Sequence, residues 1–324
     1  MNRTTTHGPE RPHTGGATNR WGLTGLTAVA PVSWGTTYLV TTELLPAGIP
    51  LLSGVIRVLP AGLLLLLISR TLPRGNWWWR AAVLGTLNIG AFNVLLFVAA
   101  YRIPGSVAAI LTTAVQPLLV AGAALVLLRE RPTRWRLGWG AVGVIGIGLI
   151  VLRGPISLDP IGMLAGLAAA ASMATGVVLT KRWGRPPNTG TMAFTGWQLA
   201  ASGLLLTPVA LLVEGPPPLP DPAAVVGYAW LAIVGTAIAY VLWFRGVGRL
   251  PVTAVSFLPL LSPVVATALG WLVLGQSLSM SQGLGFVLAM LAVAAAQLTP
   301  RTVRSLVRPD HDRPGPRSPR PAHQ

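Results

Sequence analysis

Long runs of uncharged, mostly apolar residues constrain this chain more than any other feature of its sequence. A helix of about 20 such residues crosses the hydrocarbon core of a bilayer. Six runs of this size lie at Trp21–Thr42, Ala81–Tyr101, Ile103–Leu128, Pro160–Thr180, Pro186–Val213 and Pro222–Phe244. The uncharged stretch from Leu250 to Pro300 is long enough for two spans, and Leu51–Ser69 and Leu137–Leu152 supply two more. The sequence therefore predicts ten transmembrane helices.

The composition supports an all-α integral membrane protein. Hydrophobic residues make up 52% of the chain and charged residues 10%, whereas a soluble domain carries about 25% charged residues. The loops between spans are too short for a soluble domain, and residues 1–20 and 300–324 are predicted to be disordered cytoplasmic arms, the second one basic. The net charge of +16 lies between spans, so a nucleic-acid partner is not expected. The expected partners are membrane lipid and a small-molecule substrate, and a homodimer is left open.

The positions of the basic residues predict the orientation of the chain. If the spans are numbered in order, 21 of the 24 Lys and Arg residues fall on one side, only Arg102 and Arg153 fall on the other, and Arg57 lies within a span. Loops rich in Lys and Arg stay in the cytoplasm. We therefore expect a multi-pass protein of the cell (plasma or inner) membrane with both termini cytoplasmic.

The chain also repeats itself in two halves. Residues 102–106 (RIPGS) match residues 249–253 (RLPVT) at an offset of 147, residues 33–36 (SWGT) match residues 172–175 (SMAT) at 139, and Gln116-Pro117 matches Ser262-Pro263 at 146. The halves are predicted at 21–152 and 153–299. Because each half has five spans, the second is inverted in the membrane, an arrangement typical of transporters that work by alternating access.

Several short motifs, in this order, resemble those of the drug/metabolite transporter superfamily, in particular its EamA-type ten-helix exporters. The resemblance covers residues 21–299 and rests on Ser33-Trp34-Gly35-Thr36, on Ile56-Arg57-Val58 with the leucine-rich segment after it, on Gln116-Pro117 and on Arg129-Glu130-Arg131-Pro132-Thr133. The sequence departs from the family pattern at Val58, Arg129 and Gln276. The resemblance implies two inverted five-helix repeats and export of amino acids, related metabolites or amphipathic drugs.

Arg57 is the foremost candidate for the substrate pathway. It is the only charged residue within a span, and such residues face a protein interior or a water-filled cavity. The alternative is a structural role, in which Arg57 pairs with Glu43 or with backbone carbonyl groups. Gln198 is the uncharged equivalent of Arg57 in the second half.

Other polar and aromatic side chains inside apolar spans are candidates for the same cavity. They could instead form hydrogen-bonded helix interfaces. This set comprises Trp34, Thr37, Tyr38, Asn93, Gln116, Thr175, Trp197 and Tyr240. The matched residues Pro117 and Pro263 are candidate hinges, because proline removes a helical hydrogen bond.

Catalysis, cofactor binding and metal binding are not expected. The four His residues lie in the arms, and the eight acidic residues are terminal or at loop edges. Glu43 is the one residue that could couple transport to protons, and it lies at the edge of its span. Facilitation or exchange is therefore favoured over proton coupling. The remaining alternatives to a transporter are a receptor or scaffold that moves no solute, and a channel.

Overall fold

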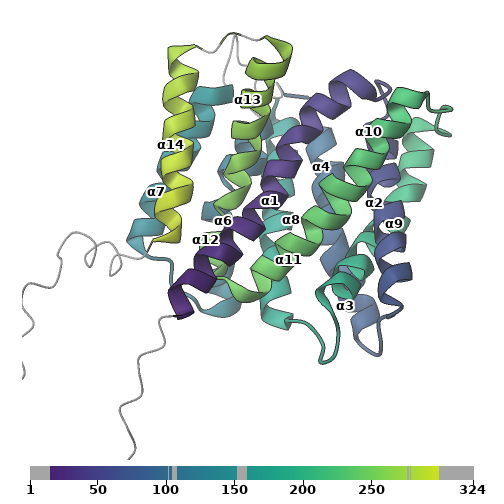
Figure 1. The fold of residues 1–324 in the computed structure, drawn as a ribbon, viewed down its shortest axis with the longest axis horizontal. Helices are drawn as coiled ribbons and strands as arrows, with labels where there is room; N and C mark the ends of the chain where they lie inside the picture. Colours follow the sequence, from purple (N-terminus) through teal and green to yellow (C-terminus); the bar gives the residue numbers. More distant parts are fainter. Residues whose placement is uncertain are drawn as a thin grey trace, which may run out of the picture.

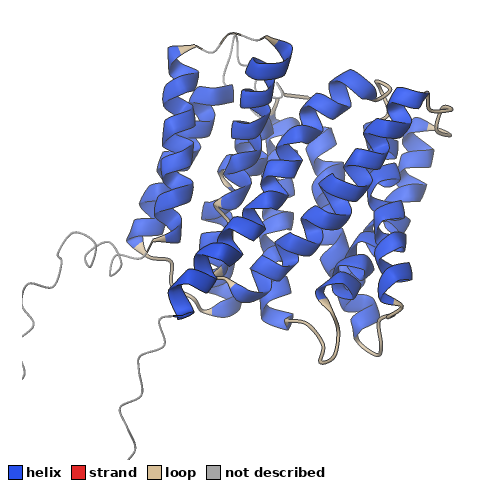
Figure 2. Cartoon of the chain, in the orientation of Figure 1, coloured by secondary structure: helices blue, strands red, loops and turns tan. Residues whose placement is uncertain are grey.

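The computed structural model describes residues 15–100, 102–103, 108–151, 159–275, 277 and 279–298, and the described part is helical without strands (Figure 2). Its helices form ten spans that run up and down in one bundle (Figure 1). The first-half elements are α1 (Gly15–Leu44), α2 (Pro50–Ser69), α3 (Trp77–Gly85), η1 (Thr86–Gly90), α4 (Ala91–Ala100), η2 (Ile110–Ala114), α6 (Gln116–Leu128) and α7 (Arg134–Val151). The second-half elements are α8 (Pro160–Trp183), α9 (Thr191–Glu214), α10 (Pro222–Ala232), η3 (Ile233–Ile238), α11 (Ala239–Arg249), α12 (Val252–Val255), η4 (Leu258–Leu260), α13 (Leu261–Leu274) and α14 (Met280–Gln297).

Ten spans were expected, and the described residues provide them. Nine are long and apolar enough to cross a membrane. The tenth is α1, which has 30 residues but is less apolar because serine, threonine and tyrosine recur along it. Helix α1 begins at Gly15, so the predicted disordered arm 1–20 is too long by six residues, and the rest of both arms lies outside the described residues.

The two halves pack against each other with reciprocal contacts. Helix α1 packs on α11 and α13, and its counterpart α8 packs on the counterparts of those helices, α4 and α6. Two further pairs, α2 with α9 and α7 with α14, join helices that are counterparts of one another. This pattern is the one expected when a two-fold relation exchanges two inverted five-helix repeats.

Charge divides the two ends of the bundle. The described Lys and Arg residues outside the spans, apart from Arg102, lie at the end where α1 begins and α14 ends, which we call the basic face (Figure 1). Four of the five described acidic residues, Glu43, Asp159, Glu214 and Asp221, lie at the other end, which we call the opposite face.

Two spans change their helical winding at equivalent positions. The π-helical segments η1 and η3 interrupt the third and eighth spans, and their first residues, Thr86 and Ile233, differ by the repeat offset of 147. A π segment frees backbone carbonyl groups from the regular α-helical pattern and occurs frequently at functional sites. These segments therefore place backbone acceptors inside both halves of the bundle.

Candidate functional site

Arg57 binds the η3 segment across the boundary between the halves. Its Nε donates to Thr236 Oγ1 at 3.1 Å, and its Nη2 donates to the Gly235 carbonyl oxygen at 3.2 Å. The side chain is half-buried. Of the partners expected for Arg57, the structure shows a backbone carbonyl, and no bond to Glu43 occurs among the described residues.

Trp34 contacts the same carbonyl and belongs to a group of neighbouring aromatic rings. Trp34 Nε1 also donates to the Gly235 oxygen, at 3.1 Å. The Trp34 ring lies 5.3 Å from the ring of Tyr240 and 5.4 Å from that of Trp243, centroid to centroid. Helices α1, α2 and α11 thus bring together Trp34, Arg57 and Tyr240, three of the predicted site residues.

Gln198 occupies the corresponding place in the other half. It is fully buried, and its Oε1 accepts a hydrogen bond from Asn88 Nδ2 at 3.1 Å. Asn88 belongs to η1, the counterpart of η3, and its Nδ2 also lies 3.3 Å from Thr180 Oγ1. Arg57 and Gln198, which are equivalent in the repeat, therefore each contact a π segment of the other half. Arg57 contacts η3, and Gln198 contacts its counterpart η1.

The Gln198 group leaves polar atoms without a protein partner. Asn88 Oδ1 and Ser202 Oγ are buried and make no hydrogen bond within the described part of the chain. Buried polar atoms are normally paired with protein or with water. The Gln198 group therefore contains one buried acceptor and one buried hydroxyl that the described protein groups leave unpaired.

The remaining predicted side chains lie on helices around these two groups. Asn93 is half-buried and its Nδ2 donates to the Ile89 carbonyl of η1 at 2.6 Å. Gln116 is buried and Thr175 is half-buried, and neither makes a side-chain hydrogen bond among the described residues. Thr37 Oγ1 is buried without a partner in the same part of the chain, while Tyr38 is 56% exposed.

Trp197 is not brought to the Arg57 group directly. Its Nε1 donates to the Thr71 carbonyl in the α2–α3 loop at 2.7 Å, so it lies toward the basic face. It is connected to the site through a row of neighbouring rings that ends at Trp34. The row runs through Phe194, Phe244 and Tyr240, with centroids 5.3–6.4 Å apart.

The candidate coupling and hinge residues lie elsewhere. Glu43 is exposed near the end of α1, where its Oε1 lies 3.3 Å from Thr42 Oγ1. Pro117 follows the π segment η2, and Pro263 follows the 3₁₀ turn η4. Because proline donates no backbone hydrogen bond, an irregular turn precedes it in both halves.

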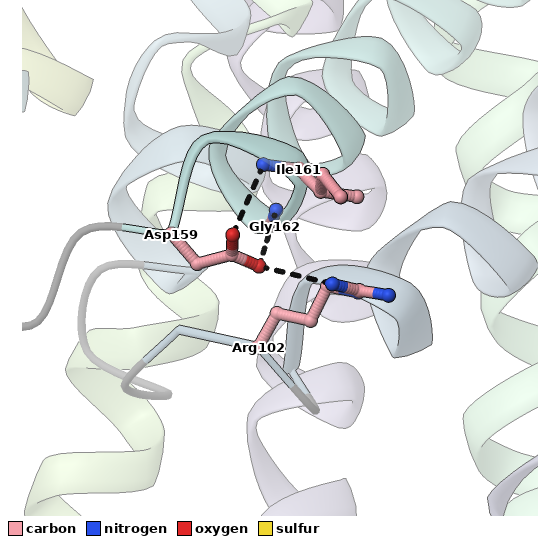
Figure 3. A network of polar contacts seen from close by, with 4 residues as sticks. All are labelled: Arg102, Asp159, Ile161 and Gly162. Atoms are coloured by element: carbon pink, nitrogen blue, oxygen red, sulfur yellow. Dashed lines mark hydrogen bonds and ion pairs between the residues drawn. The ribbon is translucent and has the colours of Figure 1, made fainter.

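An ion pair joins the two halves at the opposite face. Arg102 Nη1 lies 3.4 Å from Asp159 Oδ2, and the same carboxylate accepts from the backbone N–H groups of Ile161 and Gly162 (Figure 3). Asp159 thereby caps the first turn of α8 and ties it to the chain after α4. The described residues contain no group of three or more His, Asp or Glu side chains placed to hold a metal ion.

Sequence reasoning did not place Asn88 and Thr236 among the site residues. They are the direct partners of Gln198 and Arg57. The repeat offset of 147 could have indicated Asn88, because it aligns Asn88 with Gly235, whose carbonyl accepts from Arg57.

Comparison with known proteins gives a consistent result. The model of the EamA-like transporter family matches residues 21–152 and again residues 160–296. Protein PecM of Dickeya dadantii is 45% identical over 268 residues, which cover 83% of this chain and 90% of the relative. A probable amino-acid metabolite efflux pump of Salmonella typhimurium is 28% identical over 215 residues, or 63% of this chain and 71% of the relative.

The fold also occurs in a solved crystal structure. That chain is 20% identical to this one and superposes with a TM-score of 0.72, over 85% of this chain and 97% of the other. This likeness supports the helical arrangement described above.

Proposed function

We propose that this chain, which belongs to the EamA-like transporter family, exports a small organic solute through alternating access of its two halves. Its relatives identify it as a membrane transporter of small molecules. The direction, the substrate and the mechanism are our proposal. Alternating access is supported by the reciprocal contacts of inverted repeats, since substrate sites in such proteins lie between the repeats near the midplane.

One observation carries the placement of the site. Arg57 and Gln198 are equivalent in the two halves, and each contacts a π-helical segment that belongs to the other half. Interrupted spans provide backbone acceptors in the membrane only where they are buried in protein or line a water-filled cavity. We place the substrate between these two groups, with Trp34, Tyr240 and Asn93 around it.

The side chains favour a solute that carries a carboxylate and an apolar or aromatic part. Arg57 has no acidic partner in the described residues, so its positive charge is not neutralised there and can attract a carboxylate. The rings of Trp34, Tyr240 and Trp243 offer apolar surface next to it. An amino acid or a related metabolite has both features, and the name of the Salmonella relative agrees with this class.

We further propose that the protein lies in the plasma membrane with its basic face in the cytoplasm. The excess of Lys and Arg on that face supports this orientation. Facilitation or exchange is favoured over proton coupling, because Glu43 is exposed and lies on the opposite face.

The test is counterflow of labelled amino acids in proteoliposomes, first with the wild-type protein and then with Arg57→Gln. Counterflow should be reduced about tenfold or more for a carboxylate substrate, since a charge-assisted contact contributes about 1.5–3 kcal/mol. Arg182→Gln removes an exposed charge on the basic face and should leave counterflow unchanged. If no solute in the panel exchanges, a receptor or scaffold takes the place of the exporter. If Arg57→Gln transports normally, the site lies elsewhere.

A further inference from the structure

The halves meet in two equivalent contact regions, which we call seams, one at each face. At the opposite face, the chain after α4 meets the start of α8; at the basic face, the end of α11 meets the start of α1. The repeat offsets relate the two seams, because Arg249 lies 147 residues after Arg102 and Asp159 lies 139 residues after Arg20. The packing agrees with these offsets, which relate Ala99 to Gly246 and Thr27 to Gly166. A Cβ on Gly166 would lie 3.7 Å from Ala99, and a Cβ on Gly246 would clash with Thr27.

The chemistry of the two seams is different. At the opposite face, Arg102 pairs with Asp159, and Gly162 allows close packing because a Cβ there would lie 2.8 Å from Arg102 and Ile103 (Figure 3). At the basic face, the counterpart of Asp159 is Arg20, which lines one cavity together with Arg249, and the counterpart of Gly162 is Leu23. Like charges and a larger side chain therefore stand in this seam where the opposite one has an ion pair and a glycine.

A cavity of about 720 Å³ occupies the basic-face seam. Its charged lining is wholly basic and its other lining is mainly apolar: Arg20, Arg245, Arg249, Leu23, Leu26 and Leu250. The neighbouring cations are engaged elsewhere, since Arg136 donates to Thr253 and Lys181 to the carbonyls of Gly248 and Leu250. Glu130 lies near Arg136 but does not line the cavity.

We propose that this cavity binds a phosphate group, which replaces the carboxylate missing from the basic-face seam and closes it as Asp159 closes the opposite one. Arginine guanidinium groups bind phosphate oxygens in bidentate fashion, and three arginines line this cavity. The phosphate comes either from an anionic phospholipid headgroup, whose chains would contact the leucines, or from free phosphate. Basic pockets between helices on the cytoplasmic side are known to take lipid headgroups.

The closing of the seam can be measured by cysteine labelling, because the chain has no native cysteine. Leu26→Cys places a thiol in the cavity, and Pro187→Cys places one in the exposed α8–α9 loop of the same face as a control. Each is labelled with an uncharged maleimide in nanodiscs of phosphatidylcholine. The measurement is repeated with about one-fifth phosphatidylglycerol, or with inorganic phosphate replacing chloride at constant ionic strength.

Labelling at position 26 should slow on the order of fivefold with the anion, relative to position 187, as expected for one ion-pair closure. An effect of phosphatidylglycerol alone identifies the lipid headgroup, and an effect of inorganic phosphate identifies the free anion. In the Leu26→Cys background, Arg20→Asp should pair with Arg249, so that labelling is slow in every condition. Arg249→Ala should label fast in every condition.

Arg182→Asp makes the same change of charge on the same face outside the cavity, and its response to the anion should be that of the wild type. The proposal is wrong if neither anion slows labelling at position 26. It is also wrong if Arg182→Asp abolishes the response as Arg20→Asp does, since surface potential alone would then explain it. The assay requires no transport, so its outcome is independent of the proposed substrate.

Discussion

Gly62 offers a sharp test of how the halves are joined. It lies where α2 crosses α9, and a Cβ at this position would lie 2.4 Å from the backbone nitrogen of Ala200 and 2.8 Å from the carbonyl carbon of Leu199. Ordinary contact begins at 3.4 Å. Backbone atoms cannot rotate away, so Gly62→Ala must push the two helices apart by about 1 Å.

The expected cost follows from two opposing effects. Overpacking costs about 1–3 kcal/mol, and the upper end applies because separation also loosens the cluster of Leu51, Leu52, Val55, Leu206 and Ala210 between the same helices. Alanine regains up to about 1 kcal/mol over glycine inside a helix. The net destabilisation is therefore about 2 kcal/mol, which lowers Tm by roughly 3 °C because the unfolding entropy grows with chain length.

The assay is thermal unfolding of the purified protein in detergent, followed by tryptophan fluorescence. Gly122→Ala is the matched control, because a Cβ there meets no atom within 4 Å and the change should leave Tm equal or slightly higher. If Gly62→Ala unfolds at the wild-type temperature while remaining monodisperse, α2 and α9 do not pack as described. A drop of equal size in Gly122→Ala would show that any added methyl group destabilises the bundle.

Three further predictions concern single side chains. Glu214 accepts hydrogen bonds from two backbone N–H groups of α2 at 2.8 Å, so Glu214→Gln should cost about 1–3 kcal/mol in the same unfolding assay. Asp221→Asn keeps a good N-cap and should be neutral. Equal effects of the two changes would contradict this prediction. A cysteine at Arg134 should resist an impermeant reagent outside intact cells, and rapid labelling there would overturn the proposed orientation. Glu43→Gln should leave counterflow unchanged, and proton-driven accumulation that this variant abolishes would show that Glu43 carries the proton.

The fold could be predicted because its signals can be recognised in the sequence itself. Span length, loop charge and the repeat offsets need no knowledge of tertiary contacts. The start of α1 was misjudged for a physical reason, since Gly15 to Arg20 extend the helix beyond the apolar run and hydropathy does not register that extension.

The site could be predicted only in part, because hydrogen-bond partners depend on how distant helices are aligned. The sequence singles out Arg57 but leaves its partner open between Glu43 and a carbonyl group. The carbonyl of Gly235 accepts from Arg57 because η3 departs from α-helical winding 178 residues further along the chain. No residue type marks a π segment, so the contact of Thr236 with Arg57 emerges only when the helices are placed together.

The contact at the opposite face of the bundle and the contact in its interior have different strengths. This difference favours a particular order of motion in the proposed transport cycle. Arg102 and Asp159 are 47% and 30% exposed, and an exposed pair is worth about 0–1 kcal/mol, a factor of about five in population. When that pair opens, Asp159 still caps α8 and no buried charge is left alone. Separating Arg57 from Gly235 and Thr236 would leave a half-buried charge without partners, which costs more. We therefore expect the ion pair at the opposite face to open while the Arg57 contact holds, so that the halves turn about the π segments rather than separating there.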